Sequence, residues 1–251
     1  MILPLGDDNS DRRLVPYVTY ALIAANILVF VFLQEMGAGY KFTYAFSTVP
    51  AEILTGRDIV SASRVVRDAA SGMQYRVPGL EPTPVPVYLT LITSMFMHGG
   101  FAHLFGNMLY LFIFGDNLED RMGRRKYIIF YLLCGVAAGL AHVFASAAGG
   151  SGLEVPSLGA SGAISGVLGG YMLLFPKRQV RILLLRFITK VPAIFALGLW
   201  FLFQLVNGMG ALGGSGGGVA YGAHIGGFIA GLLLVKFFAG PAPAAGYRRV
   251  R

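Results

Sequence analysis

The sequence contains a single cysteine, Cys134. One cysteine excludes an internal disulfide and any metal site built from several thiolates. The sequence also lacks the motif His-Glu-x-x-His, because none of its glutamates stands beside a histidine, and this excludes a zinc intramembrane protease. An aspartyl protease would need two separate membrane-buried aspartates, but Asp116 and Asp120 lie together. We therefore expect neither a metal nor a cofactor.

Charge is scarce, and long stretches of the chain have none. Only 13% of the residues are charged, 55% are hydrophobic, and the mean hydropathy is +0.66. The core of a soluble domain of this size would not use so many apolar side chains. A membrane-spanning helix needs roughly 20 mostly apolar residues, and stretches of this kind recur along the chain. The composition therefore predicts an integral membrane protein.

The apolar stretches predict an all-α membrane protein, a six-transmembrane helical bundle that forms one domain over residues 1–251. The spans are expected at residues 15–36, 101–118, 126–147, 159–176, 191–208 and 220–238. An N-terminal segment (1–14), a long outer loop (37–100) and a C-terminal tail (239–251) complete the chain. The N-terminus is acidic and polar where a signal peptide would be basic and then apolar, so the first span is expected to remain in the mature protein.

Most of the basic residues fall on one side of the predicted membrane. Fifteen of the 20 lie in the N-terminal segment, in the links after the second and fourth spans, and at the C-terminal end. By the positive-inside rule this distribution places both termini in the cytoplasm. Because the basic residues flank the spans and lack interleaved aromatic residues, we expect a lipid bilayer rather than a nucleic acid as their partner.

Four polar side chains should share one depth in the membrane. The second, fourth and sixth spans all run inward from the outer side, and His103, Asn107, Ser161 and His224 lie near their outer ends. Polar and ionisable groups are costly inside a bilayer and tend to face an internal cavity. All four are therefore candidate functional residues.

A serine and a histidine at one depth suggest a nucleophile and its base. Glycines spaced three and four residues apart in the fourth and sixth spans would let these helices approach closely and bring Ser161 within reach of His224. An imidazole can accept the serine proton and return it to a leaving amine. No acidic residue lies near this depth, so we expect a dyad in which packing or a neutral hydrogen bond holds His224. His103 and Asn107, one helical turn apart, would either donate to an oxyanion or only bond neighbouring helices.

Three motifs carry a resemblance to a known family. They are His98-Gly-Gly-Phe-Ala-His103-Leu-Phe-Gly-Asn107, Gly159-Ala-Ser161-Gly162 and Ala223-His224-Ile-Gly-Gly227, and in this order they resemble the rhomboid intramembrane serine proteases. The resemblance covers the chain from about Pro86 to Val235.

The resemblance implies a cavity open to the outer side of the membrane. There Ser161 would cut the transmembrane segment of a single-pass membrane protein, with His224 as its base. His103, Asn107 and the backbone amide of Ser161 would form the oxyanion hole. The compact form of the chain resembles bacterial members, which implies the bacterial cytoplasmic (inner) membrane.

The sequence departs from the family pattern at two places. Leu89 and Thr90 stand where rhomboids often carry a Trp-Arg pair, and Ser165 stands where some members stack a tyrosine on the catalytic histidine. What orients His224 is therefore open. The glycine-rich stretch 208–218 is expected to act as a mobile cap over the site, and Trp200 to contact lipid or form a side gate.

A second class of function stays possible. A non-catalytic rhomboid-like protein would bind membrane clients, or pass a solute, in the same bundle. Such pseudoproteases usually lack the serine or the histidine, and both are present here. Two further histidines are expected to be structural, His98 through hydrogen bonds and His142 through packing.

Overall fold

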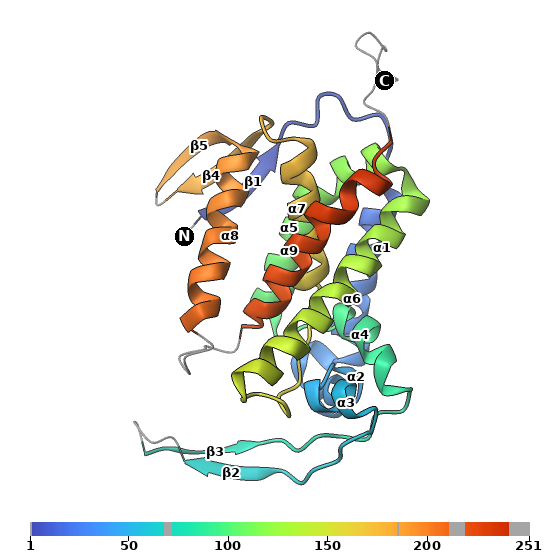
Figure 1. Ribbon diagram of the computed structural model, residues 1–251, viewed down its shortest axis with the longest axis vertical. Coiled ribbons are helices and arrows are strands. Elements are labelled where there is room, and N and C mark those ends of the chain that lie inside the picture. Colours follow the sequence, from blue (N-terminus) through green and yellow to red (C-terminus); the bar gives the residue numbers. More distant parts are fainter. Residues whose placement is uncertain (1, 68–71, 185, 211–218, 241–251) are drawn as a thin grey trace.

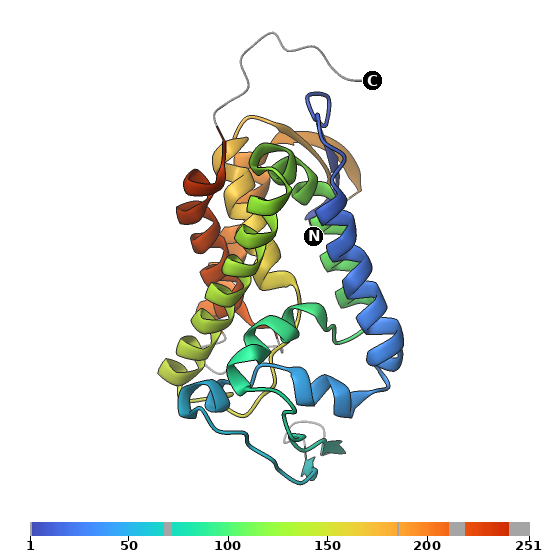
Figure 2. The same ribbon diagram turned by 90° about the vertical axis from the view of Figure 1, so that its right-hand side faces the viewer.

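The computed structural model describes residues 2–67, 72–184, 186–210 and 219–240. Long helices run side by side along the long axis of the molecule, with a sheet at one end and a hairpin at the other (Figure 1). The long helices are α1 (Tyr17–Leu28) with a π-helical continuation η1 (Val29–Leu33), α5 (Phe101–Met122), α6 (Arg124–Gly149), α7 (Ser161–Leu174), α8 (Ala193–Gly210) and α9 (Tyr221–Phe238). Viewed from the side, α1 and α9 lie at opposite edges of the bundle (Figure 2).

Three helices of the described chain are long and apolar enough to cross a membrane. They are α6, α8 and α9. The apolar stretch Tyr17–Leu33 and helix α7 are shorter than this criterion requires, and α5 carries Asp116, Glu119 and Asp120 in its last turns. The three helices indicate a chain that crosses the membrane more than once, and the count of six spans stays a prediction.

The fold is mostly helical, as predicted, but it also contains strands that the prediction of an all-α protein left out. Strands β1 (Ile2–Asp7), β4 (Gln179–Leu184) and β5 (Phe187–Pro192) form an antiparallel sheet in the order β1-β4-β5, and β2 (Arg64–Arg67) pairs with β3 (Gln74–Val77). In β4 the side chains alternate, with Val180 and Ile182 buried and Gln179 and Arg181 exposed. This period of two is the signature of a strand with one covered face. The number of charges in the link after the fourth predicted span, residues 177–190, does not reveal this period.

The long outer loop is folded. It contains η2 (Glu35–Gly37), α2 (Tyr40–Phe46), α3 (Pro50–Thr55), the β2–β3 hairpin, η3 (Val87–Leu89), α4 (Thr90–Thr93) and η4 (Ser94–Phe96). At the place of the family's Trp-Arg pair, Leu89 is exposed, whereas Thr90 is buried and its hydroxyl donates to the carbonyl of Val87 at 2.6 Å. The carbonyl of Thr90 accepts from the hydroxyl of Thr48 at 2.9 Å. Threonine hydroxyls thus tie this part of the loop together.

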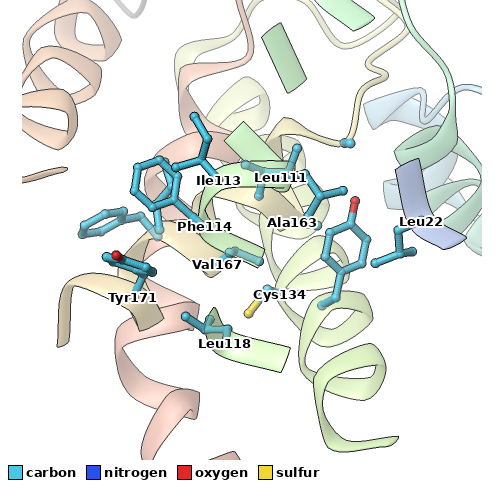
Figure 3. Close-up of a cluster of buried hydrophobic side chains, with 14 of the residues drawn as sticks. Leu22, Leu111, Ile113, Phe114, Leu118, Cys134, Ala163, Val167 and Tyr171 are labelled. Carbon is cyan, nitrogen blue, oxygen red and sulfur yellow. The ribbon is translucent and has the colours of Figure 1, made fainter. Parts of the chain in front are cut away.

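Helix α7 lies inside the bundle, and its residues from Gly162 to Tyr171 are buried. Its side chains meet those of α1, α5 and α6 in one apolar cluster, shown in Figure 3. Within it the ring of Phe114 meets the ring of Tyr171 edge-on, with centroids 4.9 Å apart. Cys134 belongs to this cluster and is fully buried.

Glycine brings α7 and α9 into backbone contact. A Cβ atom added to Gly227 would lie 2.1 Å from the carbonyl oxygen of Gly162, and one added to Gly231 would lie 1.9 Å from that of Gly166. No side chain fits at such distances. The predicted close approach of these two helices is confirmed, and it sets the distance between the residues at their N-terminal ends.

A polar network joins β1 to the bundle at the sheet end. The carboxylate of Asp7 accepts from the hydroxyl of Tyr171 and from the side-chain amide of Asn117. Burial raises the pKa of Asp7 to about 6, and the nearby charge of Asp116 acts in the same direction, while Arg178 opposes it. In the unfolded chain an aspartate ionises near pH 4. Between about pH 4 and pH 6, Asp7 therefore keeps a proton in the folded protein that it has lost in the unfolded chain.

We expect the stabilisation that Asp7 contributes to fall as the pH rises from about 4 to about 6, because Asp7 binds fewer protons in the unfolded chain than in the folded protein over this window. Replacing Asp7 with asparagine removes this dependence, which amounts to at most about 3 kcal/mol. Thermal unfolding in mild detergent, compared between parent and Asp7→Asn across the window, measures it. The control is Asp8→Asn: the backbone N–H of Ser10 holds the pKa of Asp8 below its usual value, so this variant should keep the fall. Equal pH profiles for parent and Asp7→Asn would contradict the prediction.

Candidate active site

Ser161 is the first residue of α7, and the loop before it is pinned at several points. The backbone N–H of Gly159 donates to the carbonyl of Ser94 at 2.9 Å, and the hydroxyls of Ser94 and Thr48 are hydrogen-bonded to each other at 2.9 Å. Thr48 also exchanges backbone hydrogen bonds with Ser157. Gly159 has a φ of +125°, which favours glycine, and a Cβ there would lie 2.9 Å from the ring of His103. The outer loop thus fixes the position of the serine.

His224 lies in the first turn of α9 and contacts Ser161 directly. Its Nε2 is 2.8 Å from the hydroxyl oxygen of Ser161, and its Nδ1 is 2.8 Å from Oε1 of Gln204 on α8. An amide oxygen only accepts, so Nδ1 carries the proton and Nε2 is left as an acceptor for the serine hydroxyl. The amide nitrogen of Gln204 faces the carbonyl of Trp200 at 3.4 Å, which agrees with this orientation.

Gln204 and two aromatic rings orient the histidine. The centroid of the His224 ring lies 6.0 Å from that of the Trp200 ring and 6.4 Å from that of the Tyr221 ring. Trp200 therefore contacts the site, where lipid contact or a side gate was expected. Ser165 does not take the place of the family's tyrosine, because its hydroxyl donates to the carbonyl of Ser161 at 2.6 Å.

His103 and Asn107 lie one turn apart on α5. The Nδ1 atom of His103 accepts from the backbone N–H of Gly99 at 3.2 Å, and its Nε2 edge is turned toward Gly159. Asn107 is 8% exposed, and its amide nitrogen has no hydrogen-bond acceptor among the described residues. A buried donor without a partner costs about 1–3 kcal/mol, so this amide is a donor held ready for an acceptor.

A cavity of about 30 Å³ lies beside the serine. Ser161 and Gly159 form one part of its wall, and Ser94, Met95 and His142 contribute to the rest. This volume is about that of one water molecule or one small side chain. A group bound next to the nucleophile must therefore be small.

The remaining histidines differ in their surroundings. The backbone of His98 exchanges hydrogen bonds with the side chain of Gln34, at 2.9 and 3.0 Å, while its buried ring packs edge-on against His103 at 5.1 Å. The structural role expected for His98 thus comes from its backbone. His142 lines the cavity and lies close to the backbone of α9, because a Cβ atom added to Gly222 would lie 3.3 Å from the Cα of His142. The predicted cap at 208–218 is helical up to Gly210, and the rest of it lies outside the described residues.

A profile of the Rhomboid domain matches residues 86–240, which is more than half of the chain. The chain belongs to the rhomboid family. Because the matched range contains Ser161, His224, His103 and Asn107, the four candidate residues all lie in the rhomboid domain. Family membership together with the apolar helices makes this a multi-pass integral membrane protein.

Individual rhomboid proteins are similar over different lengths. The chain is 32% identical over 235 residues to "Rhomboid protease GluP" of Bacillus subtilis, which covers 92% of this chain and 36% of that protein. It is 34% identical over 147 residues to "Rhomboid protein 1, mitochondrial" of Saccharomyces cerevisiae, covering 58% and 40%. It is 27% identical over 161 residues to "Putative rhomboid protease YdcA" of B. subtilis, covering 64% and 63%. The chain thus matches about two fifths or less of the first two relatives.

The contact of Gln204 with His224 was not predicted from the sequence. We expect Gln204→Leu to lower the rate of any reaction at Ser161 by about fivefold, since the loss of one hydrogen bond of about 1 kcal/mol releases the imidazole. Gln204→Glu keeps an acceptor oxygen at this place and should recover most of the rate. Single-turnover kinetics of the two variants beside Asn207→Leu, three residues away and exposed, measure this effect. A rate for Gln204→Leu equal to that of the parent would show that the side chain acts only by filling space.

Proposed function

We propose that this rhomboid is an intramembrane serine endopeptidase with a Ser161–His224 dyad. One observation carries the proposal, the chain of hydrogen bonds from Ser161 Oγ through both ring nitrogens of His224 to Gln204. It leaves a basic lone pair directed at the serine proton, which is what a serine nucleophile requires. The protease names of two relatives support the same activity.

The reaction would begin with attack of Ser161 Oγ on a peptide carbonyl carbon while His224 Nε2 takes the hydroxyl proton. The carbonyl oxygen becomes an oxyanion, for which the amide of Asn107, the ring of His103 and the N–H of Ser161 are the donors at hand. The last of these lies at the positive end of α7. His224 then returns the proton to the leaving amine, and water hydrolyses the acyl-serine by the same route.

The substrate proposed is a transmembrane segment of a single-pass membrane protein. The cavity of about 30 Å³ beside Ser161 would take a small side chain next to the cut. Six spans, with both termini in the cytoplasm and the dyad toward the outer side, would place the bond within reach of Ser161 in the bilayer. The bacterial cytoplasmic membrane is the proposed location.

Purified protein incubated with a tagged single-span reporter tests this function, together with a fluorophosphonate probe and a chelator. We expect cleavage that survives chelation, and a probe adduct that mass spectrometry locates on Ser161. Pretreatment with the probe should stop the cleavage. The client-binding alternative gives a different result, in which the reporter is bound and left intact and Ser161 stays unmodified. That outcome would overturn the proposal.

A further inference from the structure

The β4–β5 pair beside the first turns of α8 carries charge of one sign. Residues 176–192 include five basic residues and no acidic one. Arg178 is engaged with Asp11, whereas Arg181, Arg186 and Lys190 are exposed. Within the described ranges no carboxylate lies within 4.0 Å of these three side chains. The charge of Lys190 acts on Asp8, but from a greater distance.

Two of these cations face each other across the sheet. Arg181 on β4 is paired directly with Lys190 on β5. Like charges in this position repel and destabilise the strand pair. An anion held between the two side chains would turn this repulsion into attraction. The pair is therefore a site where, among the described residues, no carboxylate within 4.0 Å offsets the two positive charges.

Apolar side chains project from the same sheet. At the far end of the β4–β5 pair, Leu184 is 41%, Phe187 76% and Ile188 65% exposed. Leu183 is paired with Ile188, and these two lie on the face of Arg181 and Lys190, since residues two apart in a strand share a face. The sheet thus has a cationic part followed by an apolar end, the pattern of an element that lies in a membrane interface.

The place of the sheet agrees with this pattern. β5 ends at Pro192 and α8 begins at Ala193, so no linker separates the sheet from a helix long and apolar enough to span the membrane. In Figure 1 the sheet lies beside the upper end of α8 and extends down along it. Its apolar end therefore lies level with the first turns of α8, where a spanning helix that begins at Ala193 would pass from the headgroups into the acyl chains.

We infer that the β1-β4-β5 sheet is a lipid-binding wedge, in which Arg181 and Lys190 hold the phosphate of an anionic phospholipid while Phe187 and Ile188 enter its acyl chains. The lipid belongs to the leaflet nearest the N-terminus, the cytoplasmic leaflet in the proposed orientation, where the surface potential is negative. A free phosphate would satisfy the two cations but leave the apolar end exposed to water. This inference does not depend on the proteolytic activity.

Binding is tested on the full chain in detergent. An environment-sensitive dye is attached to Gln179→Cys, a position beside Arg181 on the same strand face. The native cysteine, Cys134, is buried and should not take up the dye. Short-chain phosphatidylglycerol is titrated into the labelled protein. Each cation near an anionic surface contributes about fivefold in affinity, so Arg181→Gln with Lys190→Gln should weaken binding by about 25-fold. The matched control is Arg125→Gln with Lys126→Gln, an equal loss of exposed charge at the inner end of α6, which should change little.

Phosphatidylcholine should bind weakly and inorganic phosphate should not displace the bound lipid. Equal affinity of the parent and the Arg181/Lys190 variant would overturn the inference, as would an equal loss in the control. Displacement by inorganic phosphate would also overturn it, since the site would then be one for a free anion.

Depth is tested separately in phosphatidylglycerol-phosphatidylcholine vesicles. A dye on Phe187→Cys should be quenched by lipids brominated near the headgroup end of the chain, severalfold more strongly than a dye on Ser10→Cys, an exposed residue after β1. Both positions are exposed, so neither change should disturb the fold. Equal quenching at the two positions would show that the end of the sheet stays in water.

Discussion

Replacing Ser161 with alanine is expected to reduce cleavage of a membrane reporter by at least about ten-thousand-fold. The Oγ atom is the group that would bond to the peptide carbonyl, and nothing at this position can substitute for it. Nucleophile and base act as a unit, so the loss of either removes nearly the whole rate that they supply together. His224→Ala should therefore be as inactive as Ser161→Ala, and the double variant should be no worse. Initial rates of reporter cleavage in one detergent measure all three.

Ser165→Ala provides the matched control for this prediction. It removes the same hydroxyl one turn farther along α7, where the group only donates to the carbonyl of Ser161. We expect activity near that of the parent. Cleavage that persists in Ser161→Ala would transfer the role of nucleophile to another group and would leave the contact with His224 as a packing feature.

The pairing of Ser161 with His224 follows from features that a sequence carries. Helix direction, the depth of polar residues and the glycine spacing all act along single helices, and together they place the two residues in one layer. The contact of His224 with Gln204 depends on how α8 is rotated about its axis, which only tertiary packing sets. A signal was nevertheless present, because Gln204 is a polar residue in the middle of an apolar span, and such residues tend to be functional.

The sheet was missed for a different reason. The link at residues 177–190 reads as a run of basic residues, and charge alone says nothing about period. The alternation in β4 covers only six residues, and its partner β1 lies more than 170 residues earlier in the chain. Pairing at such separation leaves no local trace. The folded outer loop is a similar case, since threonine hydroxyls and short helices hold it without a long apolar pattern.

Asn107→Ala is expected to lower the rate of the chemical step by about 10²–10³-fold, the effect of removing one oxyanion donor. The change should appear in kcat with little change in KM, because the donor is used only when charge develops on the carbonyl oxygen. The amide nitrogen of Asn107 is buried without an acceptor among the described residues, so the alanine variant loses no protein hydrogen bond from it. Its thermal midpoint should be equal to that of the parent or higher.

This combination separates the two roles left open for Asn107. If its amide only bonded neighbouring helices, the alanine variant would lose stability, and activity would fall in proportion to the fraction unfolded. Asn207→Ala is the comparison: it makes the same chemical change in the last turn of α8, where the amide donates to the carbonyl of Phe203 at 2.7 Å and no catalytic role is proposed. A large loss in kcat with an unchanged thermal midpoint for Asn107→Ala, beside an unchanged kcat for Asn207→Ala, would show that the unpaired amide stabilises the transition state.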